Sequence, residues 1–205
     1  MSFALHIGLG YLLNFLTSIP FGTINMTVAE TAVKKSKRIA LWFALGAALV
    51  QIAQIFISLK FSTILNRNEQ YSQNFIYASI PILLGLSLFF LLKKDKPVQN
   101  GTTSGDTTKG FFRGMFISSL NMVNIPFYVF VGGYLAPAKW FYLDNTHILL
   151  FSIGTFFGGL TVFLLYIRLG IWIRKKSETI SKHASRIVGC LLMALAIWQT
   201  IRLFI

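Results

Sequence analysis

Six long apolar stretches constrain this chain more than any other feature. A helix needs about 20 residues, and at least about 17, to cross the hydrocarbon core of a bilayer. The six stretches that meet this length are 3–32, 39–59, 75–92, 111–135, 147–172 and 187–205. None shows the alternation of polar and apolar residues that a membrane barrel strand requires. Because backbone groups inside lipid must be paired within their own segment, we predict an all-α polytopic membrane protein with six transmembrane helices.

The composition and the placement of the charges agree with this prediction. Only 12% of the residues are charged and 55% are hydrophobic, whereas a soluble domain is about one-quarter charged. The first, third and fifth connections and the adjoining helix ends hold 15 of the 19 Lys and Arg residues, and the other side holds four. The positive-inside rule therefore predicts that the odd connections are cytoplasmic and that both termini lie outside the cytoplasm. Basic residues that alternate with membrane spans do not form a nucleic-acid-binding face, so we expect no nucleic acid partner.

A polar segment divides the chain into two similar halves. Residues 93–110 are rich in Gly, Thr, Ser and Lys and are expected to form a flexible cytoplasmic linker between 1–92 and 111–205. The sequence Ser-Ile-Pro-Phe at 18–21 is echoed by Asn-Ile-Pro-Phe at 124–127, 106 positions later. A looser echo relates 44–48 to 152–156, 108 positions later. Since each half has three spans, the two halves would be inverted repeats, as in many secondary transporters, although short apolar echoes also arise by chance.

Two prolines inside predicted spans mark the candidate site. Pro20 and Pro126 each remove a backbone donor and free the carbonyl four residues earlier. Uncharged polar residues surround both positions, and such a setting suits a zwitterion whose carboxylate faces a half-helix N-terminus while freed carbonyls and amides accept from its ammonium. The predicted substrate-binding residues are Pro20, Gly22, Thr23, Asn25, Gln51, Asn121, Asn124 and Pro126. The alternative is a pair of kinks whose polar side chains only join helices.

Several other polar or small residues allow two interpretations. Glu30 is the candidate coupling group because it is the one carboxylate within an apolar stretch, but it could equally form an i,i+4 pair with Lys34. Gln51, Gln54 and Ser58 share one helix face and could line a cavity or bond to a neighbouring helix. The glycines at 154, 158 and 159 favour close helix packing.

Enzyme and metal chemistry are poorly supported by the sequence. We find no paired-carboxylate site, no Cys/His nucleophile arrangement and no H-E-x-x-H motif, so we expect neither enzymatic activity nor a cofactor. His6 and His147 both begin spans on the outer side, but two histidines without a third ligand do not predict a metal site. The single cysteine, Cys190, excludes an intramolecular disulfide.

The sequence resembles the lysine-exporter (LysE) family of bacterial amino-acid and metabolite exporters. The residues that carry the resemblance are Ile19 to Met26, the basic turn from Lys34 to Arg38, Phe43 to Ala47, Gly110 to Gly114, and Ser119 to Asn121. Phe21 and Gly22 stand where the family motif has a glycine and a second proline, and Met122 stands where it has the proline after an asparagine. The resemblance implies a multi-pass exporter in the bacterial inner membrane, driven by an ion gradient and acting on amino acids or related small molecules.

These lines together predict an exporter that works by alternating access between its two halves. Its expected partners are a small-molecule substrate, a coupling ion that is H+ or Na+, the lipid bilayer and, as a homodimer, a second copy of the chain. Two other functions remain open. One is a membrane scaffold or assembly protein that transports nothing, and the other is an exporter of small ions or metals.

Overall fold

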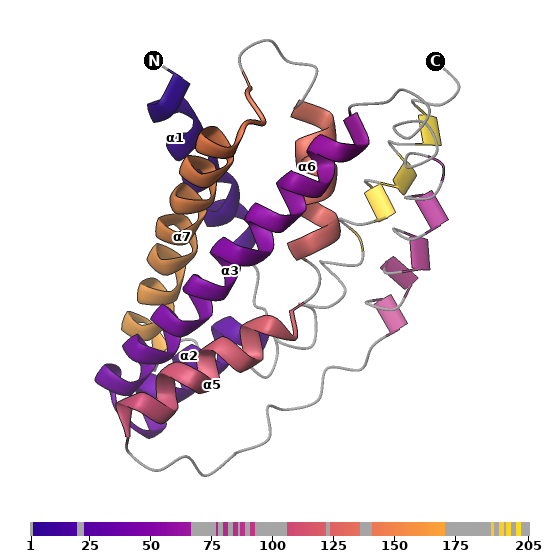
Figure 1. Ribbon diagram of the computed structural model, residues 1–205. Coiled ribbons are helices and arrows are strands. Elements are labelled where there is room, and N and C mark those ends of the chain that lie inside the picture. Colours follow the sequence, from indigo (N-terminus) through magenta and orange to yellow (C-terminus); the bar gives the residue numbers. More distant parts are fainter. Residues whose placement is uncertain are drawn as a thin grey trace.

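The computed structural model describes residues 2–19, 23–66, 106–121, 124–135 and 141–170, together with isolated residues within 77–92 and 190–201. These residues contain six helices and no strand (Figure 1). The helices are α1 (Ser2–Ser18), α2 (Thr23–Lys34), α3 (Lys37–Asn66), α5 (Thr107–Ser119), α6 (Asn124–Leu135) and α7 (Asn145–Arg168). The all-helical expectation is therefore confirmed for the described part of the chain.

The first apolar stretch forms two helices instead of one. α1 ends at Ser18 and α2 begins at Thr23, so the interruption surrounds Pro20. A residue that precedes proline is disfavoured in the α conformation, and a proline inside a helix removes a hydrogen bond. Ile19 accordingly lies outside both helices. The predicted break in this stretch is confirmed.

The fourth apolar stretch is broken in the same way, but its proline has a different role. α5 ends at Ser119, α6 begins at Asn124, and the pair is bent by 60°. We expected Pro126 to interrupt a helix from within, yet it is the third residue of α6. The first N–H groups of a helix have no intrahelical partner, so a proline there costs no hydrogen bond. Pro126 therefore starts a helix, and the break precedes it.

Within the part of the chain that the structure describes, two helices are long and apolar enough to cross a membrane. They are α3 and α7, and the bent pair of α5 and α6 is a third candidate if it is counted as one span. α1 is also apolar, but at 17 residues it is only about 25 Å long, less than a bilayer core. The predicted spans 75–92 and 187–205 lie mostly outside the described residues, so the number six stays a prediction.

Each half of the chain packs its broken helices on the long helix of the other half. α1 lies along α7, α5 lies along α3, and α3 and α7 also contact each other (Figure 1). α2 packs on both α3 and α7, and α6 packs on α3. The buried apolar side chains form two clusters, one around Phe43 and Phe163 and the other around Leu59 and Phe151.

Glycines bring the two main helix pairs into backbone contact. A Cβ added at Gly154 of α7 would lie 2.1 Å from the carbonyl oxygen of Ile7, and one added at Gly46 of α3 would lie 2.2 Å from that of Phe111. Without a side chain at these positions, the helix backbones can approach closely, as small residues allow in membrane helix pairs. The expectation that the glycines of α7 serve close packing is thus confirmed.

Candidate functional site

A hydrogen-bonded group of uncharged side chains lies in the middle of the molecule, around Asn14 of α1. Asn14 is 2% exposed, and its Nδ2 donates to Gln51 Oε1 of α3 at 3.0 Å and to the carbonyl of Thr155 of α7 at 2.6 Å. Its Oδ1 accepts from the hydroxyls of Ser18 and Tyr128, both at 3.3 Å. One amide therefore joins α1 to α3, α6 and α7.

The break between α1 and α2 has two of its carbonyls bonded by side chains. Asn25 of α2 is buried, and its Nδ2 donates to the carbonyl of Ser18 at 2.6 Å. The hydroxyl of Tyr166 of α7 donates to the carbonyl of Ile19 at 2.9 Å. Backbone groups at membrane depth are tolerated only where protein or water satisfies them, and here the protein itself supplies the donors.

At the break between α5 and α6, a side chain of α3 hydrogen-bonds to the residues on both sides of the interruption. Gln54 is buried, and its Nε2 donates to the carbonyl of Ser118, the penultimate residue of α5, at 3.2 Å. Gln54 Oε1 accepts from Nδ2 of Asn124, the first residue of α6, also at 3.2 Å. The Ser118 hydroxyl donates to the carbonyl of Ala47 at 2.9 Å.

The contacts around Asn14 and the contacts around Gln54 form one network, because α3 and α6 contribute side chains to both. Gln51 and Gln54 are neighbours on α3, and Asn124 and Tyr128 are one turn apart on α6. All of these side chains are uncharged, and they offer both donors and acceptors. Such a network can exchange its internal hydrogen bonds for bonds to a polar solute without exposing an unpaired charge.

The structure brings together three of the eight predicted substrate-binding residues. Asn25, Gln51 and Asn124 all belong to the network. Asn121 is partly buried at the end of α5, where its backbone N–H donates to the carbonyl of Ser118 at 3.0 Å. Pro126 lies in the first turn of α6. Pro20, Gly22 and the side chain of Thr23 lie outside the described residues.

The polar face of α3 and the acidic residue of α2 are also resolved. Gln51 and Gln54 hydrogen-bond to neighbouring helices, as the second interpretation of this face proposed, whereas Ser58 donates to the carbonyl of Gln54 in its own helix. Glu30 forms an ion pair with Lys34, one turn further along α2, as the alternative interpretation expected. An exposed pair of this kind contributes only about 0.3–0.5 kcal/mol.

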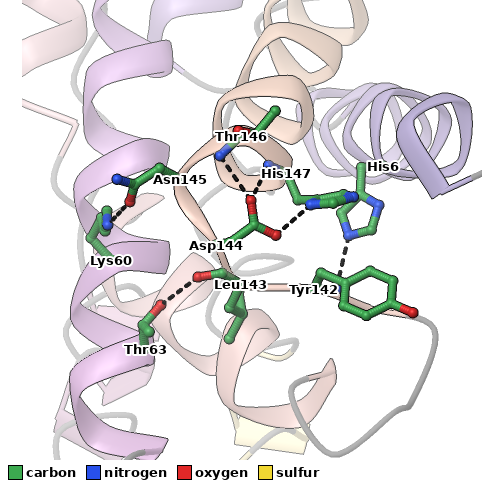
Figure 2. Close-up of polar contacts among 9 residues, drawn as sticks. All are labelled: His6, Lys60, Thr63, Tyr142, Leu143, Asp144, Asn145, Thr146 and His147. Atoms are coloured by element: carbon green, nitrogen blue, oxygen red, sulfur yellow. Dashed lines mark hydrogen bonds and ion pairs between the residues drawn. The ribbon is translucent and has the colours of Figure 1, made fainter.

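A second polar cluster lies where α1 and α7 both begin, and it contains two histidines (Figure 2). His6 is fully buried, and its ring centroid lies 4.5 Å from that of His147. His147 contacts the carboxylate of Asp144, which also accepts from the backbone N–H groups of Thr146 and His147 as the N-cap of α7. Nowhere in the described ranges do three His, Cys, Asp or Glu side chains gather so that they could hold a metal ion.

Three residues at the centre of the network were not among the predicted site residues. They are Asn14, Tyr128 and Tyr166. Asn14 was visible in the sequence as a polar residue near Pro20, and each tyrosine lies in an apolar helix where its hydroxyl needs a partner. That need for a partner is the signal that could have identified them.

Comparison with known families identifies the chain. The family described as LysE type translocator matches residues 15–201. The chain belongs to the LysE type translocator family. No curated protein and no solved structure matches it. The resemblance seen in the sequence is therefore confirmed over nearly the whole length.

Membership of the LysE type translocator family places the network in a transport protein. The family consists of transporters, not enzymes, and a translocator implies a small-molecule substrate. Together with the apolar helices, membership also places the chain in a membrane.

Proposed function

We propose that this LysE type translocator exports amino acids or related small zwitterions across the bacterial inner membrane by alternating access. The network around the two helix breaks, including Asn25, Asn121 and the first turn of α6, would be the substrate site. Its halves would be inverted repeats that move against each other about this site.

The single observation that carries the proposal is the bonding of the interrupted helices. Side chains of the protein occupy the carbonyls of Ser18, Ile19 and Ser118 in this structure. An ammonium group is a stronger donor than an amide or a hydroxyl, so it can replace Asn25 or Gln54 at these carbonyls. Without a solute at these carbonyls, the side chains of the protein would satisfy the broken helices.

Three pairs of contacts support the inverted repeat. Asn14 donates to the carbonyl of Thr155, and Ser118 donates to that of Ala47, so the donors are 104 positions apart and the acceptors 108. In the second pair, Gly154 contacts Ile7 and Gly46 contacts Phe111. The two glycines are again 108 positions apart, and the residues that they contact are again 104 apart.

The third pair repeats these offsets. A Cβ at Gly10 would lie 2.1 Å from the carbonyl oxygen of Phe151, and one at Gly114 would lie 2.0 Å from that of Phe43. Three pairs of contacts, one of hydrogen bonds and two of glycine–carbonyl approaches, share the same two offsets, and this is not expected by chance. They favour two halves of the same architecture. The first helix of each half, α1 or α5, packs against the long helix of the other half, α7 or α3.

The basic residues support the proposed orientation. Lys35 lies in the turn between α2 and α3, where partial burial and the nearby charge of Arg113 on α5 lower its pKa. The start of α5 and the α2–α3 turn therefore meet at one end of the bundle (Figure 1). Basic clusters of this kind mark the cytoplasmic side, which would place the beginnings of α1 and α7 outside.

The test of the function is solute movement in proteoliposomes that contain the purified translocator. We expect exchange of a labelled amino acid by the unmodified protein, and its loss in Asn25→Ala and Asn121→Ala without loss of inserted protein. Ser119→Ala is the matched control, because this exposed hydroxyl bonds only to the carbonyl of Phe116 in its own helix. Undiminished exchange in both asparagine variants would remove the site assignment.

A thermal-shift screen separates the transporter from a membrane scaffold. A bound solute stabilises the folded protein by about 2.7 kcal/mol at a hundred times its Kd, because it binds the folded state alone. We expect at least one amino acid to raise the Tm of the unmodified protein but not that of Asn25→Ala. A scaffold would show no solute-dependent change.

A further inference from the structure

The histidine cluster at the start of α1 and α7 lies apart from the proposed substrate site. His6 comes from the first turns of α1, His147 comes from the first turn of α7, and Tyr142 belongs to the segment 141–144 that leads into α7 (Figure 2). Phe141 is 4% exposed, and its ring stacks on that of His6 at 4.9 Å. The segment thus covers His6.

The ring of His6 accepts a hydrogen bond from the backbone of the covering segment. The backbone N–H of Tyr142 donates to His6 Nε2 at 3.0 Å. A backbone N–H can only donate, so Nε2 is the acceptor of this bond, as it is in a neutral imidazole. A proton that binds at Nε2 would turn this acceptor into a donor facing another donor, and the bond would be lost.

The surrounding charges allow such a proton to bind. The groups that face His6 and its cover are Asp144, His147, Tyr142 and, from α3, Lys60, which bonds to Asn145. Partial burial opposes ionisation of Asp144, but hydrogen bonds from His147 and Thr146 outweigh it and hold its pKa below the usual range. Asp144 therefore stays negative, and the faces of the Phe141 and Tyr142 rings also favour a cation at His6.

We propose that His6 is a proton-binding site, and that a proton there releases Phe141 and Tyr142 from α1, while Asp144 still caps α7, and opens this end of the α1–α7 contact. We further propose that the translocator uses this proton as its coupling ion, a step that rests on the proposed function. Histidine is suited to this role because it changes charge between about pH 5 and pH 8. Glu30, the coupling candidate predicted from the sequence, forms an ion pair with Lys34. Both residues belong to α2, not to α1 or α7.

The opening can be measured by cysteine labelling without any transport assay. Cys190→Ala removes the one native thiol, and Phe141→Cys then places a thiol at the buried position of the covering segment. Tyr142→Cys, at an exposed position in the same segment, corrects for the effect of pH on the reagent. We expect the ratio of the two labelling rates to rise as the pH falls from about 7.5 to about 5.5, by up to about tenfold per unit for one proton.

His6→Gln is the decisive variant. The glutamine Oε1 can accept from the Tyr142 N–H in place of Nε2, but it does not bind a proton in this range. We expect the cover to stay closed and the labelling ratio to become independent of pH. An unchanged pH response in His6→Gln would overturn the proposal.

Two further measurements guard against a misfolded variant and a wrong assignment. Hydrogen exchange at the Tyr142 amide of the unmodified protein, corrected for intrinsic pH dependence, should lose protection over the same range; constant protection would contradict the opening. In His147→Gln the response should persist, because His6 and its bond to the Tyr142 N–H are retained. If the response vanishes in this variant and persists in His6→Gln, the proton binds at His147 and our assignment is wrong.

Transport then tests coupling separately. His6→Gln should exchange labelled solute like the unmodified protein but should no longer accumulate it in response to a pH gradient. Gradient-driven accumulation that persists in this variant would refute coupling through His6. If the unmodified protein moves no amino acid at all, the proposed function fails, while the labelling experiment still decides whether His6 binds the proton.

Discussion

At the residue scale, the contact between Asn14 and Gln51 depends on a neighbour without a side chain. Gly159 of α7 lies against both amides, and a Cβ there would be 2.6 Å from Asn14 Nδ2 and 2.7 Å from Gln51 Oε1. Buried amides are costly to leave without partners, at about 1–3 kcal/mol for each unsatisfied group. The glycine therefore makes room for the bond that joins α1 to α3.

We predict that Gly159→Ala destabilises the protein by about 1–3 kcal/mol, because the added methyl pushes the two amides apart. Thermal unfolding in detergent would show this as a lower Tm. Gly8→Ala is the matched control, since nothing lies within 4 Å of a Cβ at that position of α1. An equal Tm for the two variants would mean that the network tolerates displacement.

At the element scale, α7 begins at the N-cap residue Asp144, which was not among the residues singled out from the sequence. Asp144 accepts from the N–H groups of Thr146 and His147 and also contacts the His147 ring. An N-cap of this kind stabilises a helix by about 1 kcal/mol. The cap therefore fixes the position at which α7 starts, and with it the cover over His6.

We expect Asp144→Ala to lower the free energy of unfolding by about 1 kcal/mol at neutral pH. Because the folded-state pKa of Asp144 lies below its usual value, this stabilisation is complete above about pH 4 and is lost as the pH falls through the folded pKa. Unfolding curves of both proteins should therefore converge in acid. Asp106→Ala, at the N-cap of α5 where Thr108 donates, should leave α7 unaffected.

The glycine seams give a second prediction for the elements. Gly154→Ala would place a methyl 2.1 Å from a carbonyl of α1, and backbone cannot yield as a flexible side chain does. We expect α1 and α7 to separate locally and the Tm to fall, with a cost of about 1–3 kcal/mol. Gly133→Ala on α6, where the nearest atom would be 3.9 Å away, should change stability far less. Similar losses in both would show that the seam is not the cause.

At the scale of the whole molecule, the two halves are interlocked. α1 packs on α7 and α5 packs on α3, so neither half can bury its broken helices alone. The segment that joins the halves in the sequence is not needed for these contacts, because they lie between helices. The assembled molecule should consequently survive a cut in this segment.

We predict that a protease site inserted within 101–105 can be cleaved in the purified protein while the halves stay together. Size-exclusion chromatography in detergent should give one peak that contains both fragments. A cut protein that also carries Gly114→Ala and Gly154→Ala should separate, since a Cβ at either position would lie about 2 Å from a backbone oxygen of the partner helix. Separation without these substitutions would show that the linker holds the halves together.

Much of the architecture could be predicted from the sequence. Apolar length, the two prolines and the glycine pattern indicated helices, breaks and close packing, and all three are properties of short segments. Asn25 and Asn124 were predicted near the breaks for the same reason and lie there, while the role of Asn25, Gln51 and Asn124 in substrate binding stays a prediction. Pro126 was misplaced by a few residues, because the sequence shows that a helix cannot continue through a proline but not whether it ends before the proline or bends at it.

Local chemistry alone was enough to predict that this chain is helical, lies in a membrane and is interrupted near Pro20 and Pro126. The packing of the helices settles which donors satisfy the interrupted backbone, that Asn14 joins four helices, and that the Tyr142 N–H donates to His6. The contacts of Asn14 with Thr155 and Tyr128, of Tyr166 with Ile19 and of Tyr142 with His6 each join residues more than 100 positions apart. Their partners are chosen by how helices pack in space, and no local pattern encodes that choice.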